Sequence, residues 1–222
     1  MRSDTSHLDA FGRRLTDLGV VPVVEIDNAD RAIDLARTLV EAGLPCAEIT
    51  FRTAATADAI AAIAVAVPEL YLGAGTVRTI EQADAALASG AQFLVAPCYN
   101  PRVVSHAQEL CIPMLPGVST PTEIDAACEC GFSLLKLFPA GALGGISYLK
   151  VIAAAFGDVR FVPTGGIDAA TLADYLALPQ VACCGGSWMI GRQRLAEGDF
   201  AAIGRLAAEA VATVAAQRRK IP

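Results

Sequence analysis

Short apolar runs of strand length alternate along this chain with alanine-rich segments of helical length. The runs recur at a spacing of roughly 25 residues, and they are apolar enough to be covered on both faces, as strands of parallel sheets are. Repeated strand and helix units of this kind predict an α/β fold with a parallel sheet. The eight predicted strands begin at Val20, Cys46, Tyr71, Phe93, Ile112, Leu134, Arg160 and Ala182.

Eight such units favour a closed (β/α)8 barrel, the TIM barrel, and the length of 222 residues suits one barrel. An open doubly wound sheet is the alternative, and it would usually carry a nucleotide motif. The segment GAGTVR from Gly73 does not have the G-x-G-x-x-G spacing, and no P-loop motif occurs. We therefore expect a single barrel domain over residues 1–222, with an extra helix in the first 18 residues.

Several helix boundaries are marked in the sequence. Thr120 followed by Pro121 and Glu123 is typical of a capped helix start, and Asn100-Pro101 and Asp168 are expected to open two further helices. Glycine is common just past the end of a helix. The glycines predicted at helix ends are Gly43, Gly90 and Gly131.

Charge and hydropathy exclude two classes of partner. The net charge is −6, and no basic stretch is longer than the RRK at Arg218, which argues against nucleic acid. The N-terminus lacks the apolar segment of a signal peptide, and the longest small-apolar run, from Ala59, is too short to span a bilayer. We expect a cytoplasmic protein that does not contact membranes.

Cysteine and histidine do not form a metal-binding pattern. The seven cysteines include no C-x-x-C pair, so free and mostly buried thiols are expected. The only histidines are His7 and His106, and neither has a partner at ligand spacing. The sequence predicts no metal and no cofactor.

Lys136 stands in the middle of the apolar run LLKLFPA and is one of only three lysines. Side chains alternate along a strand, so Lys136 and Phe138 share one face while Leu135 and Leu137 share the other. If the leucines pack under the helices, the lysine points into the barrel. The alternative is an edge strand, or a lysine that extends its ammonium to water. Burial disfavours a charged amine, and a neutral amine attacks carbonyl carbons, so an inward lysine suggests Schiff-base chemistry.

Glu48, Thr50 and Arg52 share one face if the segment AEITFR is a strand. An ion pair within a helix is the alternative interpretation of Glu48 and Arg52. An acid and a base inside a barrel are costly unless they pair or bind a ligand. The functional interpretation is that Arg52 binds a substrate carboxylate and Glu48 transfers protons.

Two glycine pairs, in PTGGI from Pro163 and CGGSW from Cys184, end the last two predicted strands. Ordinary turn glycines would explain each pair alone. Backbone N–H groups in such loops can also bind an anion, and the loops after strands seven and eight of a barrel are a usual phosphate site. Ser187 would add a hydroxyl donor.

These segments together resemble one family. EITFRT, GAGTV, VAPC, PGVST, KLFPA, PTGGI and GGSW closely resemble 2-keto-3-deoxy-6-phosphogluconate (KDPG) and 4-hydroxy-2-oxoglutarate (KHG) aldolases, from about Val20 to about Ala216. The resemblance implies a class I, Schiff-base aldolase on a (β/α)8 barrel. It also implies pyruvate as a product, keto-acid substrates and a homotrimer.

The resemblance also assigns roles by position. It implies Lys136 as the Schiff-base lysine and Glu48 as the acid and base. The implied substrate-binding residues are Arg52, Thr76, Pro97, Phe138, Gly165, Gly166, Gly186 and Ser187. Glu25 and Cys98 depart from the family pattern, which affects the expected rim of the pocket. The alternatives are a phosphate-binding barrel isomerase or epimerase, a 2-keto-3-deoxy-6-phosphogalactonate aldolase, and a non-catalytic phosphosugar-binding protein.

Overall fold

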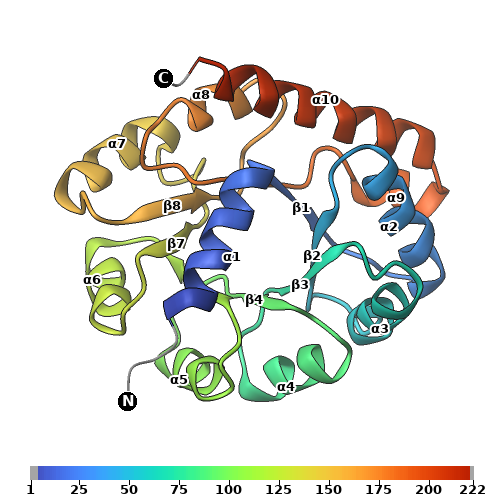
Figure 1. The fold of residues 1–222 in the computed structure, drawn as a ribbon, viewed down its shortest axis with the longest axis horizontal. Coiled ribbons are helices and arrows are strands. Elements are labelled where there is room, and N and C mark those ends of the chain that lie inside the picture. The colour runs from blue at the N-terminus through green and yellow to red at the C-terminus, as the bar shows by residue number, and fades with distance from the viewer. Residues whose placement is uncertain (1–4, 221–222) are drawn as a thin grey trace.

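The computed structural model describes residues 5–220, with side chains from residue 10 onward, and it contains a curled parallel sheet surrounded by helices (Figure 1). Every predicted strand run contains a strand, and the run from Ile112 is divided at Pro116, which has no N–H to contribute to a ladder. The strands are β1 Val20–Val24, β2 Cys46–Thr50, β3 Tyr71–Gly75, β4 Phe93–Val95, β5 Met114–Leu115, β6 Gly117–Val118, β7 Leu134–Leu137, β8 Arg160–Pro163 and β9 Cys184–Gly186.

Parallel pairing orders the strands into two groups, β5-β4-β3-β2-β1-β9 and β6-β7-β8. Only Pro116 separates β5 from β6 in the chain. On the other side, single bridges join Phe161 to Val181 and Thr164 to Gly185, so β8 lies beside the β9 segment. Because all pairs are parallel, the carboxyl ends of the strands meet at one end of the sheet.

Helices follow most strands and lie around the outside of the sheet (Figure 1). A 3-10 turn, η1 Ala29–Arg31, precedes the second helix. The helices are α1 Thr5–Leu18, α2 Ala32–Glu41, α3 Thr56–Ala66, α4 Ile80–Ala88, α5 Pro101–Glu109, α6 Pro121–Glu129, α7 Gly145–Ala155, α8 Leu172–Leu176, α9 Arg192–Glu197 and α10 Phe200–Arg218.

Most of the predicted helix boundaries are confirmed. Thr120 caps α6 in a reciprocal capping box with Glu123, and Asn100 caps α5 through the Arg102 N–H. Gly43, Gly90 and Gly131 follow helices with positive φ. The prediction that Asp168 opens a helix is wrong. Its carboxylate accepts hydrogen bonds from the N–H groups of Ala170 and Thr171 in the turn that follows it, and α8 begins only at Leu172.

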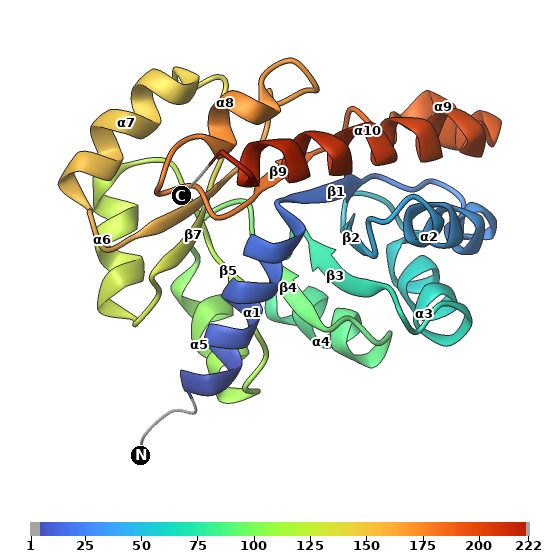
Figure 2. The same cartoon turned by 45° about the horizontal axis from the view of Figure 1, so that its top comes forward.

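Two apolar clusters show which side chains point in and which point out. Leu135 and Leu137 belong to the cluster between sheet and helices, while Leu134 packs against the cluster inside the sheet. The inner cluster includes Phe11 and Leu15 of α1, and the Phe11 ring lies 5.5 Å from that of Phe93. Several residues of this inner cluster are the first residues of their strands, so α1 covers the amino ends of the strands (Figure 2). A ligand site is therefore expected at the opposite, carboxyl ends.

All seven cysteines are free, as predicted, but they are not mostly buried. Cys46, Cys183 and Cys184 are buried, whereas Cys98, Cys111 and Cys130 are exposed in loops and at helix ends. Within residues 5–220, no helix is long and apolar enough to cross a membrane.

Candidate active site

A buried ion pair joins opposite parts of the sheet. Lys136 of β7 and Glu48 of β2 place Nζ 3.0 Å from Oε1 and 3.4 Å from Oε2. Their side chains are 5% and 4% exposed. Lys136 therefore points into the sheet, as strand alternation predicts, and the segment of Glu48 is a strand rather than a helix. Since β7 lies between β6 and β8, Lys136 is neither on an edge strand nor extended to water.

Glu48 and Lys136 are the two buried charged side chains among the described residues. Removing a buried charge from water is costly, and the cost is offset here only because the two opposite charges are in contact. Each group therefore depends on the other, and a ligand that enters must replace or rearrange this contact.

Gly75, at the end of β3, provides the space that Glu48 occupies. A Cβ atom on Gly75 would overlap the Glu48 carboxylate, which lies on the neighbouring strand. The glycines of GAGT are thus explained by close approach rather than by nucleotide binding.

The layer beneath the ion pair carries no charge at neutral pH. Burial raises the pKa of the Cys183 thiol to about 12 and that of Cys46 well above its usual range. Burial also raises the pKa of Tyr71 to about 12. These groups stay protonated and add no charge beneath the ion pair.

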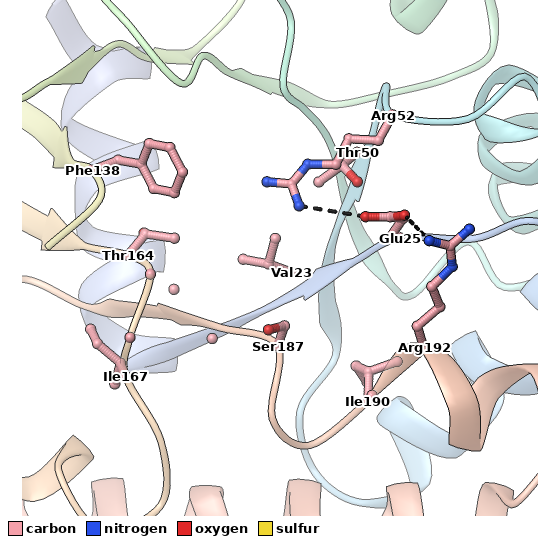
Figure 3. A pocket seen from close by; sticks show the side chains of 15 residues that line it. Val23, Glu25, Thr50, Arg52, Phe138, Thr164, Ile167, Ser187, Ile190 and Arg192 are labelled. Atoms are coloured by element: carbon pink, nitrogen blue, oxygen red, sulfur yellow. Dashed lines mark ion pairs between the residues drawn. The ribbon is translucent and has the colours of Figure 1, made fainter. Parts of the chain in front are cut away.

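A pocket of about 350 Å³ opens at the carboxyl ends of the strands (Figure 3). In that view Arg52 extends between Phe138 on one side and Glu25 on the other. Phe138 also connects the pocket with the ion pair, because its ring centre lies 5.6 Å from the Lys136 Nζ. The lining residues are Val23, Glu25, Thr50, Arg52, Phe138, Thr164, Gly165, Gly166, Ile167, Gly185, Gly186, Ser187, Ile190, Gly191 and Arg192.

The structure brings most of the predicted site residues together. Lys136 and Glu48 lie inside the sheet. The predicted residues in the pocket wall come from the loops after β2, β7 and β8 and from the end of β9 with the residue that follows it. Thr76 and Pro97 are not among the lining residues of this pocket. Thr76 has a positive φ of 57°, an uncommon conformation for a non-glycine residue, at the end of β3. The predicted residues in the wall are Arg52, Phe138, Gly165, Gly166, Gly186 and Ser187.

The two glycine pairs lie side by side, because the Thr164–Gly185 bridge joins their loops. Gly165 and Gly166 have φ of 88° and 78°, which a residue with a side chain would adopt only with strain. Among the described residues, the Gly166 N–H has no hydrogen-bond acceptor. Such N–H groups at a pocket can bind an anion.

The sequence placed Glu25 at the expected rim of the pocket and Thr50 on an inward face, without a function for either, and it did not indicate Thr164 and Arg192; all four line the pocket. Cys98, the other residue expected at the rim, is not among the lining residues. Arg192 holds Asp27 with bonds of 2.7 and 2.8 Å from Nε and Nη2. This contact lowers the pKa of the Asp27 carboxyl and raises the pKa of Arg192.

A buried amine beside a carboxylate, beneath a pocket at the carboxyl ends of parallel strands, defines an enzyme site for a carbonyl compound. Within residues 5–220, no cluster of three or more histidine, cysteine, aspartate or glutamate side chains could hold a metal ion.

Comparison with known proteins gives the family. The family model for KDPG and KHG aldolase matches residues 12–206. A 2-dehydro-3-deoxy-phosphogluconate aldolase of Treponema pallidum is 47% identical over 195 residues, which cover 88% of this chain and 93% of the relative. The KHG/KDPG aldolase of Escherichia coli K12 is 43% identical and covers 89% of this chain and 92% of its own.

A solved structure agrees with the sequence relatives. The KDPG aldolase of Legionella pneumophila, with pyruvate captured as a covalent carbinolamine intermediate, matches with a TM-score of 0.86 and 34% identity. The match covers 89% of this chain and 96% of that one. The chain belongs to the KDPG and KHG aldolase family and is an aldolase, a lyase.

Proposed function

We propose that this aldolase cleaves KDPG to pyruvate and glyceraldehyde 3-phosphate through a Schiff base at Lys136. The observation that carries the proposal is the buried Lys136–Glu48 pair beneath a pocket with a guanidinium and two glycine loops in its wall. The relatives named above support the choice of substrate.

Glu48 begins the reaction by accepting a proton from the Lys136 ammonium across the 3.0 Å contact. The neutral amine then adds to the C2 ketone and forms a carbinolamine. Glu48 returns its proton to the carbinolamine hydroxyl, which leaves as water. An iminium at C2 remains.

The iminium accepts the electrons of the C3–C4 bond. Glu48 takes the proton of the C4 hydroxyl, directly or through a water, the C3–C4 bond breaks, and the aldehyde leaves. Glu48 then protonates C3 of the resulting enamine, and water hydrolyses the new iminium to pyruvate and free Lys136. One carboxylate serves every proton transfer because it lies beside the amine.

Arg52 is proposed to bind the substrate carboxylate and Phe138 to pack on the carbon chain. Gly165, Gly166, Gly186 and Ser187 are proposed to bind the phosphate. Thr76 and Pro97 remain part of the proposal as residues that contact the pyruvate part of the substrate, on the strength of the family resemblance.

A second substrate follows from the same chemistry. KHG carries the same C1 carboxylate, C2 ketone and C4 hydroxyl, so its cleavage to pyruvate and glyoxylate needs no further group. The name of the 43% identical relative, KHG/KDPG aldolase, supports this second activity.

We also propose a domain organisation, an oligomeric state and a cellular location for the protein. Residues 1–222 are proposed to be one domain, a closed (β/α)8 barrel with α1 as an additional helix. The two bridges between β8 and the β9 segment support closure. A homotrimer in the cytoplasm is proposed from the family resemblance, and sedimentation of the purified protein tests the trimer.

Pyruvate with borohydride tests the Schiff base directly. Incubation should inactivate the enzyme and add one three-carbon unit to the peptide that contains Lys136, because borohydride reduces the iminium to a stable amine. Peptide mass mapping measures the site. The other two lysines, Lys150 and Lys220, are internal controls, and labelling of either one instead of Lys136 would exclude the proposed mechanism.

Substitution of Ser187 tests the phosphate site. Ser187→Asp sets a carboxylate against the phosphate, so kcat/KM for KDPG should fall by about 10²-fold. KHG, which lacks a phosphate, should lose much less. Ser187→Asn is the matched neutral control and should retain most KDPG cleavage. Equal losses of KDPG and KHG cleavage in Ser187→Asp would mean that the phosphate binds elsewhere.

A further inference from the structure

Three charged side chains of alternating sign, Arg52, Glu25 and Arg192, form a row at the rim of the pocket (Figure 3), and Asp27 extends the row away from the pocket. Glu25 stands between two arginines, with Oε2 3.5 Å from Arg52 Nη1 and Oε1 3.0 Å from Arg192 Nη1. Asp27 binds the far side of Arg192. Two guanidinium groups and two carboxylates therefore leave the row with no net charge.

The fold places three members of this row in the pocket wall. Glu25 directly follows β1, Arg52 follows β2 by two residues, and Arg192 begins α9 after β9. These three strands are neighbours in the order β2-β1-β9. Glu25, Arg52 and Arg192 all line the pocket, whereas Asp27 does not.

The distances show that the two arginines are held differently. Arg192 donates two short hydrogen bonds to Asp27, in a bidentate arrangement that fixes its guanidinium. The Arg52 Nη1 lies 3.5 Å from the Glu25 Oε2, which is too far for a well-formed hydrogen bond. The Glu25 carboxylate at this distance still offsets part of the positive charge of Arg52. Arg52 thus keeps its N–H groups for a ligand, while part of its charge is already neutralised.

We infer that Glu25 is a specificity-determining residue, which weakens the binding of phosphorylated substrates and so narrows the preference for them over unphosphorylated ones. The inference rests on the proposed function for its substrates. A phosphate dianion at the glycine loops of this pocket meets the fixed negative charge of Glu25, which lines the same pocket. An uncharged hydroxyl in the place of the phosphate is not repelled by Glu25. The loss of binding free energy therefore grows with the negative charge at that end of the substrate.

A purely positioning role for Glu25 makes a different prediction. If Glu25 only directed Arg52, its loss would weaken every substrate with a C1 carboxylate, whether phosphorylated or not. The long Arg52–Glu25 contact argues against this role, because an ion pair without a hydrogen bond restricts orientation poorly.

The test compares KDPG with 2-keto-3-deoxygluconate, which has the same carbon skeleton without phosphate. In Glu25→Gln, the ratio of kcat/KM for KDPG to that for the unphosphorylated compound should rise roughly 3- to 10-fold. The rise should shrink at about 0.5 M salt, because the rim is partly exposed and salt screens it.

Two variants serve as matched controls. Glu25→Asp keeps the charge and should leave the ratio within about twofold of wild type. Asp30→Asn removes the same charge from an exposed residue of η1 that does not line the pocket, and it should leave the ratio unchanged. An unchanged or lower ratio in Glu25→Gln, or an equal rise in either control, would overturn the inference.

A binding measurement separates this inference from the proposed function. Inorganic phosphate should bind Glu25→Gln more tightly than wild type, by roughly the same factor, in calorimetric titration. If wild type cleaves neither keto acid, the proposed function fails and phosphate binding still decides the role of Glu25. Equal phosphate affinities for wild type and Glu25→Gln would contradict the role of Glu25 alone.

Discussion

Lys136→Met should eliminate KDPG cleavage and pyruvate trapping together. Methionine approximates the length of lysine but has no amine, so neither the carbinolamine nor the iminium can form. Loss of a covalent nucleophile reaches about 10⁶-fold in other enzymes, which sets the expected scale for kcat. The measurement is KDPG turnover followed through pyruvate release, with borohydride trapping on the same sample.

Stability must be separated from chemistry in this experiment. Lys136→Met leaves the Glu48 carboxylate buried without its partner, which typically costs about 3 to 5 kcal/mol of folding free energy. The double variant Lys136→Met/Glu48→Gln removes both charges and should recover much of that stability while remaining inactive. Activity in a folded Lys136→Met protein would place the Schiff base on another residue or remove it from the mechanism.

Glu48→Gln should cleave KDPG about 10²- to 10⁴-fold more slowly, because the amide keeps the shape of the side chain and cannot transfer protons. Its oxygen can still accept the Lys136 Nζ–H, so the amine keeps its position. Pyruvate with borohydride should still label Lys136 after prolonged incubation.

The control for Glu48→Gln is the adduct itself. A variant that forms the pyruvate adduct but turns over slowly has lost proton transfer in the steps after adduct formation. A variant that forms no adduct has lost either the deprotonation or the position of Lys136, and near wild-type turnover would assign proton transfer to a different group.

The sequence determined the elements and the face of each strand. Apolar runs separated by helical segments defined the parallel sheet, because both faces of such a sheet are covered. Alternation along β7 and β2 then placed Lys136 and Glu48 inward, since neighbouring leucine and isoleucine residues had to meet the helices. Local capping chemistry also located the start of α6 at Thr120.

The sequence failed where a local signal was ambiguous. Asp168 has the chemistry of a helix cap, yet its carboxylate binds the turn that precedes α8. Pro116 divides a run that looked continuous, because a proline interrupts the ladder without changing hydropathy. Cys98, Cys111 and Cys130 are exposed rather than buried, because they lie in loops and at helix ends. No periodic pattern in the sequence predicts the exposure of such positions.

Tertiary structure decided which of these residues meet. Lys136 and Glu48 are 88 positions apart, and only the curvature of the sheet brings them to 3.0 Å. The sequence showed Glu25 as an acid at a strand end, but its two arginine partners come from the loop after β2 and from the segment after β9. Residue type and alternation act over a few positions along the chain. Contacts between charges depend on distances across the sheet. Strand order and the curvature of the sheet set those distances, and a linear pattern does not contain them.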